Sequence, residues 1–376
     1  MKDSFDSFYQ NRSVFVTGHT GFKGGWLVTW LKMLGANITG FALPPRQDQP
    51  NLCQIAAIDH GITSIMGDIR DLTMLMAAFE TAQPEVIFHL AAQPIVRRSY
   101  LNPLETIATN VMGTAHVLEA ARQTPSVRVV VIITTDKCYE NFEWVYAYRE
   151  NDPMGGHDPY SASKGAAELV TAAYRRSFFP IERYEAHQVC LSSVRAGNVI
   201  GGGDWSEDRL ISDCVKALTA EQPIRIRNPQ AIRPWQHVLE PLAGYMWLAA
   251  RMWNNPHFAG AWTFGPSAAS NATVRYIVDR VLQCWGSGEW EDMSELQTDA
   301  PHEATFLKLD CTKAANLLNW SPILSLDQGI ATTMAWYRTY YHTPTFDGHD
   351  FTMEQIKTYS KLAQETGVSW AVSNGN

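Results

Sequence analysis

The sequence predicts an α/β protein: a Rossmann-type doubly wound parallel sheet, followed by a smaller mixed α/β C-terminal domain. Two observations carry this prediction. Short runs of almost wholly apolar residues alternate with amphipathic helical stretches through the first half, and a glycine-rich turn follows the first run. Strands that are apolar throughout suit a parallel sheet, because crossover helices cover both of its faces. Alternating strands and helices are the pattern of a doubly wound fold.

The expected elements follow in order along the chain. Strands are predicted at residues 13–18, 37–43, 62–68, 86–92, 127–135 and 189–198. Between them, apolar residues recur at intervals of three and four, which predicts helices over 24–35 and 103–122. After residue 198 the alternation gives way to a glycine-rich loop, short strands and helices. The clearest of these helices are expected at 209–218, 238–253 and 273–285.

Composition and charge exclude several classes of protein. A net charge of -8, from 38 acidic and 30 basic residues, gives no overall attraction for nucleic acid or an anionic membrane. The six cysteines are scattered, without a CxxC pair or histidines at zinc spacing, so no metal site is expected. The chain has no long apolar run and no signal-peptide pattern at its start. We therefore expect a cytoplasmic protein that does not enter a membrane.

The first predicted strand ends in the glycine-rich turn "TGHTGFKG". Gly18, Gly21 and Gly24 are spaced by three residues before a helix. Glycines let the backbone turn tightly and let a pyrophosphate approach the amides at the helix N-terminus, so a bound dinucleotide is expected here. His19 and Lys23 stand between the glycines, where they would bring bulk and charge close to the phosphates.

The identity of the dinucleotide stays open at this point. The second strand is not followed by the acidic residue that accepts the ribose hydroxyls in NAD sites, and Arg46 lies just beyond it. NAD is expected, and NADP with its 2′-phosphate is not excluded. Asp68, at the end of the third strand, is expected either to accept a hydrogen bond from the adenine amino group or to cap the next helix.

The segment "DPYSASKGAAELV" predicts a helix with a reactive pair near its start. Asp158 is the expected N-cap and Pro159 the first helical residue. Tyr160 and Lys164 are then one turn apart on one face. An ammonium beside a phenol lowers the pKa of the phenol, so Tyr160 is expected to act as a base near neutral pH.

Together these motifs resemble the extended short-chain dehydrogenase/reductases that act on nucleotide sugars. "TGHTGFKG", "GDIRD", "HLAAQPIVRRS", "NPLETIATNVMGT", "TTDKCY", "YSASK", "RAGNVIGGGDW" and "RPWQHV" occur in that family's order and cover residues 12 to 310. Within the family the chain most resembles the branch of 4,6-dehydratases that act on CDP-glucose. The resemblance implies an NAD-dependent lyase that oxidises carbon 4 of CDP-D-glucose, eliminates water across carbons 5 and 6, and returns the hydride to carbon 6. The product is CDP-4-keto-6-deoxy-D-glucose, a precursor for the deoxysugars of surface polysaccharide such as the O-antigen of lipopolysaccharide.

The adjacent residues Asp136 and Lys137 have a place in this chemistry. Family members place a Thr or Ser after the fifth strand to bind the sugar 4-hydroxyl, and Thr135 stands there. Dehydratases of the family have an acid and base pair in the next two positions, commonly Asp-Glu, whereas the 4-epimerases have none. We assign Asp136 as the acid and Lys137 as the base, against the alternative of a solvated turn. Neighbouring strand residues face opposite ways, so both can reach one sugar only if the backbone turns after Thr135.

The motifs and the resemblance give the following candidate site residues. The catalytic residues expected are Thr135, Asp136, Lys137, Tyr160 and Lys164. The cofactor-binding residues expected are Gly18, His19, Gly21, Phe22, Lys23, Gly24, Asp68, Ile69, Ala91, Ala92, Tyr160 and Lys164. The substrate-binding residues expected are Gln93, Asn198, Arg209, Arg233 and His237. Residues 300–310 resemble a later nucleotide-contacting segment of the family, in which His302 is left without a role.

The domain division expected is residues 1–198 for the dinucleotide and 199–376 mainly for the nucleotide-sugar substrate, with segments near 238–265 returning to the first domain. The resemblance implies a homodimer, or a dimer of dimers, formed through helices that include 103–122 and 159–176. Two other functions stay open. A nucleotide-sugar 4-epimerase would need Tyr160 and Lys164 but neither Asp136 nor Lys137, and a non-catalytic NAD(P)-sensing protein would need no activated phenol.

Overall fold

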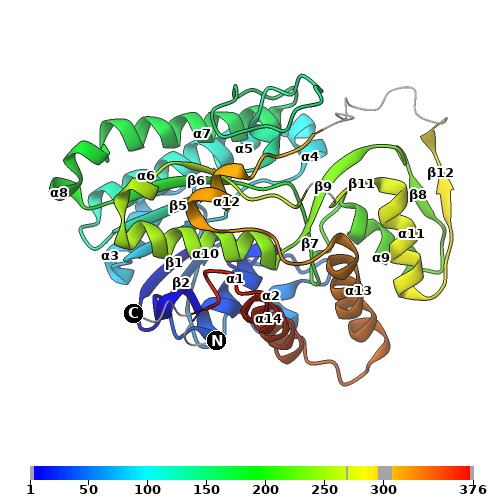
Figure 1. The fold of residues 1–376 in the computed structure, drawn as a ribbon. Coiled ribbons are helices and arrows are strands. Elements are labelled where there is room, and N and C mark those ends of the chain that lie inside the picture. Colours follow the sequence, from blue (N-terminus) through cyan, green and yellow to red (C-terminus); the bar gives the residue numbers. More distant parts are fainter. Residues whose placement is uncertain (1–3, 268–269, 295–306, 373–376) are drawn as a thin grey trace.

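The computed structural model describes residues 4–267, 270–294 and 307–372, and its centre is a seven-stranded sheet (Figure 1). In spatial order the strands are β3 (Thr63–Met66), β2 (Asn37–Ala42), β1 (Ser13–Thr17), β4 (Val86–His89), β5 (Val129–Ile133), β6 (Cys190–Arg195) and β10 (Ala261–Thr263). Every neighbouring pair is parallel. The predicted doubly wound parallel sheet is confirmed, although the strands expected over 127–135 and 189–198 end earlier, at Ile133 and Arg195.

Helices cover both faces of this sheet. On one face α3 (Leu72–Ala82), α6 (Gly113–Gln123) and α7 (Pro159–Ser177) pack against one another, and on the other face lie α1 (Phe22–Met33) and α10 (Leu239–Asn254) (Figure 1). Every residue of β4 and β5 is buried as a result. This burial on both sides explains why the strands are apolar throughout instead of alternating with polar residues.

Shorter helical segments connect these elements. In the first half they are η1 (Ser4–Ser7), α2 (Leu52–Ile55), α4 (Val96–Leu101), α5 (Pro103–Ile107), the π-helical η2 (Ala108–Met112), η3 (Asp136–Cys138), η4 (Ile181–Arg183) and α8 (Tyr184–His187). The helix predicted over 103–122 is therefore α5, η2 and α6 in succession. None of the helices in the described residues combines the length and apolar character that crossing a membrane requires.

The second half forms a smaller mixed region beside the carboxyl ends of the central strands. One sheet joins β7 (Asn198–Ile200), β9 (Ile232–His237) and β11 (Asn271–Thr273), and a second pairs β8 (Ile224–Ile226) with β12 (Trp290–Asp292). The helical segments are α9 (Leu210–Thr219), η5 (Pro256–Phe258), α11 (Val274–Trp285), α12 (Thr312–Leu318), α13 (Leu326–His342) and α14 (Gly348–Glu365). The helices expected at 209–218, 238–253 and 273–285 are confirmed as α9, α10 and α11.

The chain passes between the two regions more than once. Strand β10 pairs with β6 at the edge of the central sheet, and α10 packs on the neighbouring strands. Near the C-terminus, α14 packs against α1, and the Trp370 ring stacks on Phe5 with ring centroids 5.1 Å apart. The two ends of the chain therefore meet on the same side of the sheet (Figure 1). The domain boundary at residue 198 stays a prediction.

Candidate functional site

A cavity of about 1030 Å³ runs along the carboxyl ends of the central strands and on into the smaller region. It is lined by the glycine-rich turn after β1, by the turn after β5 and the start of α7, and by α9 and β8. Ligands of doubly wound sheets bind at this edge. The cavity is therefore the candidate active site.

The glycine-rich turn fits a dinucleotide. Gly18 has a φ of 77°, and a Cβ there would lie 2.8 Å from the Ala91 nitrogen. A Cβ on Gly24 would lie 2.1 Å from the Gly18 carbonyl oxygen, so the turn and α1 can pack this closely only without side chains. The N-cap of α1 is Gly21, and no side chain caps the helix. Its first N–H groups are therefore available to a phosphate, as the spacing of the glycines predicts.

Most of the predicted cofactor-binding residues line the cavity. They are Gly18, Gly21, Phe22, Lys23, Gly24, Asp68, Ile69, Ala91 and Ala92. Burial, together with the nearby Arg209 and Lys164, lowers the pKa of Lys23 to about 7. An anionic ligand in the cavity would favour the protonated form of Lys23.

His19 does not take the place predicted for it. Its ring is fully buried and packs against Gly40, so closely that a Cβ on Gly40 would lie 2.5 Å from the ring. The ring Nε2 lies 2.8 Å from Ser64 Oγ. The side chain is outside the cavity lining, and burial lowers its pKa to about 4. The prediction that His19 crowds the phosphates with bulk and charge is therefore wrong. The turn directs its side chain toward β2, where Gly40 leaves room.

Asp68 is engaged by its own neighbour. Its carboxylate accepts from the Arg70 guanidinium, at 2.5 Å from NH2, and from the Arg70 backbone N–H at 2.9 Å. The hydrogen bonds and charge of Arg70 hold the pKa of Asp68 below its usual value. The N-cap of α3 is Asp71, which accepts from the Met74 N–H. The alternative that Asp68 caps this helix is therefore wrong, and its role toward adenine stays a prediction.

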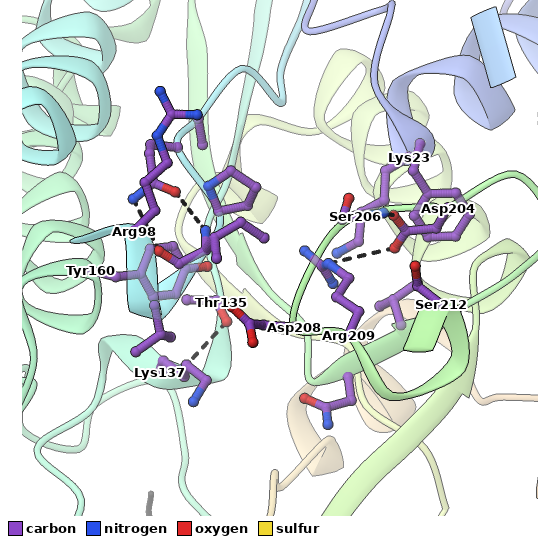
Figure 2. Close-up of a pocket in the computed structure, with 18 of the residues that line it drawn as sticks. Lys23, Arg98, Thr135, Lys137, Tyr160, Asp204, Ser206, Asp208, Arg209 and Ser212 are labelled. Carbon is purple, nitrogen blue, oxygen red and sulfur yellow. Dashed lines mark hydrogen bonds and ion pairs between the residues drawn. The ribbon is translucent and has the colours of Figure 1, made fainter. Parts of the chain in front are cut away.

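The backbone turns directly after Thr135. Strand β5 ends at Ile133, and the short helix η3 begins at Asp136, with the Lys137 N–H 3.4 Å from Thr135 Oγ1. Asp136 and Lys137 consequently both line the cavity, although they are neighbours in sequence. Figure 2 shows Thr135, Lys137 and Tyr160 close together on one side of it. The turn gives the acid and the base access to the same space, which was the condition for their joint use.

Asp136 lies in surroundings that favour its neutral form. It is 3% exposed, and its Oδ1 accepts from Thr135 Oγ1 at 2.9 Å. Burial raises the pKa of Asp136 despite the opposing charge of Lys137 and the Thr135 hydrogen bond. A raised pKa is the direction that a general acid requires.

The start of α7 has the predicted form. Asp158 caps the helix by accepting from the Ser161 N–H, and Pro159 is its first residue. Tyr160 and Lys164 are buried on the cavity wall, and Thr135, whose Oγ1 donates to Asp136 Oδ1, lines the same cavity.

The predicted lowering of the Tyr160 pKa is wrong for this structure. Burial raises the pKa of Tyr160 to about 12, although the nearby Arg209 opposes it. The Lys164 ammonium donates to the Ile133 carbonyl at 3.4 Å, and burial lowers its pKa to about 8. Desolvation of the phenol therefore outweighs the cations around it.

A buried ion pair that the sequence reasoning missed lies behind the catalytic turn. Glu168 and Arg195 are each 3% exposed and are joined by two hydrogen bonds, of 2.8 and 3.0 Å. The carboxylate also accepts from Thr134 Oγ1 at 2.5 Å and Ser193 Oγ at 2.7 Å. Arg195 NH1 donates to the Tyr139 hydroxyl at 2.9 Å. The pair thereby holds the residues on both flanks of the turn that carries Asp136 and Lys137.

Three of the predicted substrate residues reach the cavity with side chains suited to a polar ligand. Asn198, Arg209 and Arg233 line it, and Arg209 Nε lies 3.5 Å from Asp204 Oδ2 (Figure 2). Gln93 also lines the cavity, but its amide donates to the Ile95 carbonyl and Thr106 Oγ1 and accepts from the Ile95 N–H. Its side chain therefore supports the loop after β4.

His237 is not part of the site. It is 1% exposed, lies edge to face against Trp26, and accepts from the Leu239 N–H through Nδ1. Burial lowers its pKa to about 3, and it does not line the cavity. The prediction that it binds the substrate nucleotide is wrong, because β9 turns this residue toward α1. Of the segment 300–310, residues 300–306, including His302, lie outside the described residues.

The cavity also contains polar residues to which the sequence analysis gave no role. They are Arg97, Arg98, Asp204, Ser206, Asp208, Ser212, Asp213 and Arg227. The first three stand inside the motifs "HLAAQPIVRRS" and "RAGNVIGGGDW", whereas the others lie where the sequence has no recurring spacing to mark them. Asp208 lies 3.5 Å from Arg97 and 3.4 Å from Arg227, so it joins the two regions across the cavity.

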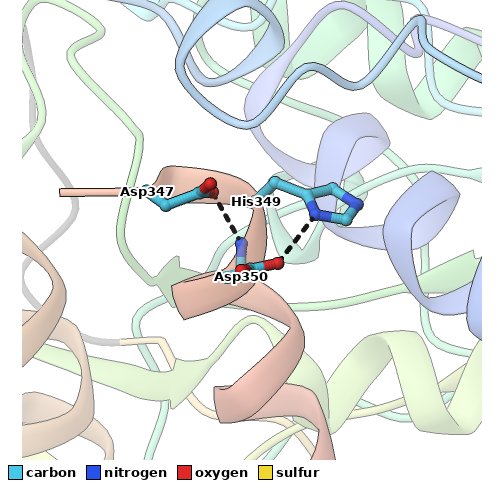
Figure 3. Close-up of side chains that lie close together, drawn as sticks. All are labelled: Asp347, His349 and Asp350. Carbon is cyan, nitrogen blue, oxygen red and sulfur yellow. Dashed lines mark hydrogen bonds and ion pairs between the residues drawn. The ribbon is translucent and has the colours of Figure 1, made fainter. Parts of the chain in front are cut away.

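A separate group of potential metal ligands lies at the start of α14. Figure 3 shows Asp347, His349 and Asp350 close together. Asp347 caps the helix by accepting from the Asp350 N–H at 2.9 Å, and His349 Nδ1 lies 3.3 Å from Asp350 Oδ1. Helix capping explains why these side chains converge, so we assign no metal to them.

The chain is similar to known nucleotide-sugar enzymes over most of its length. A family model described as GDP-mannose 4,6 dehydratase matches residues 15–333. The CDP-glucose 4,6-dehydratase of Salmonella typhimurium is 50% identical over 337 residues, which cover 89% of this chain and 92% of the relative. The dTDP-glucose 4,6-dehydratase of Streptomyces antibioticus is 27% identical, over 74% of this chain and 77% of the relative.

Solved structures share the fold at lower identity. A dTDP-glucose 4,6-dehydratase from Streptomyces venezuelae superposes with a TM-score of 0.71 at 24% identity, covering 88% of this chain and 99% of that one. A UDP-glucose 4-epimerase from Thermotoga maritima gives a TM-score of 0.72 at 20% identity, covering 88% and 99%. The predicted resemblance to the extended dehydrogenase/reductases of nucleotide sugars is confirmed. With a family model matched from residue 15 to residue 333, the chain belongs to the GDP-mannose 4,6 dehydratase family.

Proposed function

We propose that this protein is a sugar-nucleotide 4,6-dehydratase, a hydro-lyase that converts CDP-D-glucose to CDP-4-keto-6-deoxy-D-glucose. The observation that carries the proposal is the turn after β5, which brings Asp136 and Lys137 into the cavity beside Tyr160. The 50% identity to a CDP-glucose 4,6-dehydratase supports the same reaction and the same nucleotide. An epimerase needs no acid and base pair at this position.

The cofactor proposed is NAD. Two dehydratase structures of similar fold contain NAD, and the glycine-rich turn of this chain leaves the first amides of α1 free for its phosphates. Arg46, which could favour NADP, is paired with Asp48 at 2.5 Å and lies 3.6 Å from Glu207. These two carboxylates would repel a 2′-phosphate. When bound, NAD accepts a hydride from carbon 4 of the sugar and later returns it to carbon 6.

The residues of the chain supply the proton transfers. Tyr160 as a phenolate takes the proton of the 4-hydroxyl as this carbon is oxidised to a ketone. Burial disfavours the phenolate, whereas Arg209 and the positive ring of NAD, when it is bound, would favour it. The ketone acidifies the hydrogen on carbon 5, and Lys137 as a neutral amine removes it. Asp136 as a neutral carboxyl protonates the 6-hydroxyl, which leaves as water. Carbon 5 takes up a proton again once carbon 6 has been reduced.

The buried position of Asp136 bears on which protonation state the pair adopts. A neutral carboxyl and a neutral amine carry the same net charge as the ion pair, so a dry site that penalises separated charges favours them. In water the ion pair is favoured by roughly 6 pK units. The burial that raises the pKa of Asp136 acts in the direction needed to close this gap.

The reaction is expected to be redox-neutral. CDP-glucose deuterated at carbon 4 should yield product deuterated at carbon 6, because the same hydride leaves and returns. Mass spectrometry and NMR of the product measure this, with UDP-glucose and dTDP-glucose as parallel substrates. Accumulation of NADH in step with product would indicate a simple dehydrogenase, and a sugar inverted at carbon 4 would indicate an epimerase.

We further propose a homodimer, alone or as half of a dimer of dimers, that occupies the cytoplasm. The proposal is supported by apolar side chains exposed on α4, α5 and α7, three helices that pack against one another: Leu101 and Leu104 are each 80% exposed and Leu169 is 60% exposed. Exposed apolar side chains on neighbouring helices suit a protein interface. All six cysteines are described and free, which suits a reducing compartment.

The Leu104→Glu variant is expected to be monomeric, because it places a charge at the centre of this apolar face. Light scattering after size-exclusion chromatography measures the mass, and the wild type should elute at twice the chain mass or more. Leu317→Glu is the matched control, since Leu317 is 58% exposed on α12, away from the three helices. A Leu104→Glu protein with the mass of the wild type would contradict the proposed interface.

A further inference from the structure

The part of the cavity between α9 and β8 has a distinct lining. Leu210, Asp213 and Ala217 lie on one face of α9, because they are spaced by three and four residues. Pro223 and Ile224, where β8 begins, line the cavity with them. Four apolar residues and one carboxylate thus belong to the same lining.

The substrate fills this part of the cavity if the proposed function holds, and the inference rests on it. The sugar must lie at Asp136 and Lys137. Arg209, the N-cap of α9, and Arg233 on β9 are cations that suit the diphosphate that follows the sugar. The nucleoside follows the diphosphate, so from Arg209 it can enter the space between α9 and β8.

The carboxylate of Asp213 is unlike the other acids of this region. Asp208 is paired with Arg97 and Arg227, and Asp204 with Arg209. Asp213 is half-buried, and its side chain makes no hydrogen bond or ion pair with any of the described residues. The charges that act on it are Lys216 on its own helix, Asp208 and Glu207 on the preceding loop, and Arg97 on α4.

The ionisation state of Asp213 determines which hydrogen bonds it can make to a nucleobase. Burial raises the pKa of Asp213 to about 6, so it is ionised at neutral pH and can only accept hydrogen bonds. Cytosine presents an amino group at position 4, whereas uracil and thymine present a carbonyl oxygen there. An amino group satisfies the buried carboxylate, and an oxygen leaves it unsatisfied and repelled.

We propose that Asp213 selects the base of the nucleotide, by accepting a hydrogen bond from the 4-amino group of cytosine. Leu210, Ala217 and Ile224 pack against the faces of the ring and do not distinguish one pyrimidine from another. Specificity then comes from repulsion of uracil and thymine as much as from attraction of cytosine.

The test is the binding of CDP and UDP, which differ in the base alone, to the full chain with NAD present. Isothermal titration calorimetry should show that the wild type binds CDP at least about tenfold more tightly than UDP. In Asp213→Asn the amide can turn either its oxygen or its NH2 to the base. The variant should bind CDP about tenfold more weakly and UDP as tightly as the wild type or more so, which removes the preference.

Matched measurements separate this inference from the proposed function. Glu221→Gln makes the same change of charge just beyond α9, at an exposed residue outside the cavity lining, and should keep the wild-type preference. Because Asp213→Asn should still bind UDP, that binding shows that the variant is folded. An unchanged ratio of CDP to UDP affinity, or equal weakening of both, would overturn the role of Asp213. Failure of the wild type to form a 4-keto product would instead overturn the proposed function, whatever the binding ratio.

Discussion

Replacing Lys137 by methionine should slow turnover of CDP-glucose by about 10² to 10⁴-fold, while carbon 4 is still oxidised. Methionine has a similar length but cannot take the proton from carbon 5. Tyr160 and Thr135 remain in place for the first step. The variant should therefore accumulate reduced cofactor on mixing with substrate, seen by stopped-flow absorbance, and exchange of the carbon 5 hydrogen with deuterated solvent should fall most.

Asp136→Asn should slow turnover to a similar extent but leave a different trace. The amide keeps the size of the carboxyl and its place beside Thr135 but cannot protonate the leaving 6-hydroxyl. Exchange at carbon 5 should persist, because Lys137 is intact, while loss of water fails. The control for Lys137→Met is Lys361→Met, which removes the positive charge of an exposed lysine on α14. Near-normal turnover in both site variants would mean that this segment is a solvated turn, and the epimerase should then be assayed.

Glu168→Gln should lower the free energy of unfolding by about 3 to 5 kcal/mol, because it leaves the buried Arg195 guanidinium without its counter-charge. Both oxygens of the carboxylate are engaged, by Arg195 and by the hydroxyls of Thr134 and Ser193. The shift of the denaturant midpoint measures the loss. Glu354→Gln removes one partner of an exposed pair with Lys357, and its cost should stay below about 1 kcal/mol.

The stability contributed by Glu168 should depend on pH. Burial alone would raise the pKa of Glu168, but Arg195 and the two hydroxyls hold it below its usual value. Its contribution to stability is therefore present at neutral pH and lost as the pH falls through the pKa of the folded state. The difference in the free energy of unfolding between the wild type and Glu168→Gln should become smaller in acid. Replacing Glu168 and Arg195 together by methionine leaves no buried charge, so it should cost less than the single change. A Glu168→Gln variant that loses as little stability as Glu354→Gln would contradict this role of the ion pair.

The backbone of the active site could be predicted from the sequence, because it depends on local signals. Three glycines at a fixed spacing specify the turn after β1, and Asp158 with Pro159 specifies the start of α7. Only a turn after Thr135 lets Asp136 and Lys137 share one substrate, and that turn is present.

The directions and environments of side chains were harder to predict, because they depend on residues distant in sequence. His19 and His237 stand inside motifs, yet Gly40 leaves room for the first ring and Trp26 packs against the second, so neither enters the cavity. The expected effect of Lys164 on Tyr160 considered a charge beside a phenol and left out the desolvation that burial adds.

Of the residues that the sequence analysis missed, some carry a local sequence signal and others do not. Glu168 follows Lys164 by four residues on the same face of α7, so the spacing that indicated Tyr160 and Lys164 extends to it. Its partner Arg195 lies on strand β6, and only the packing of α7 on β6 brings the two together. Asp213 is an ordinary acid on an amphipathic helix until β8 is placed opposite to it.

The late return of β10 to the edge of the central sheet has a consequence for biosynthesis. The ribosome must add all residues from Arg195 to Thr263 before β6 can receive its outer neighbour, which at about 5 to 20 residues per second takes several seconds. During this time the nascent chain presents β6 as an open edge, with unpaired N–H and C=O groups that can join a strand of another chain. A transcript cut short between these points would encode a chain that keeps this edge, so premature termination should yield aggregates and not a smaller folded protein.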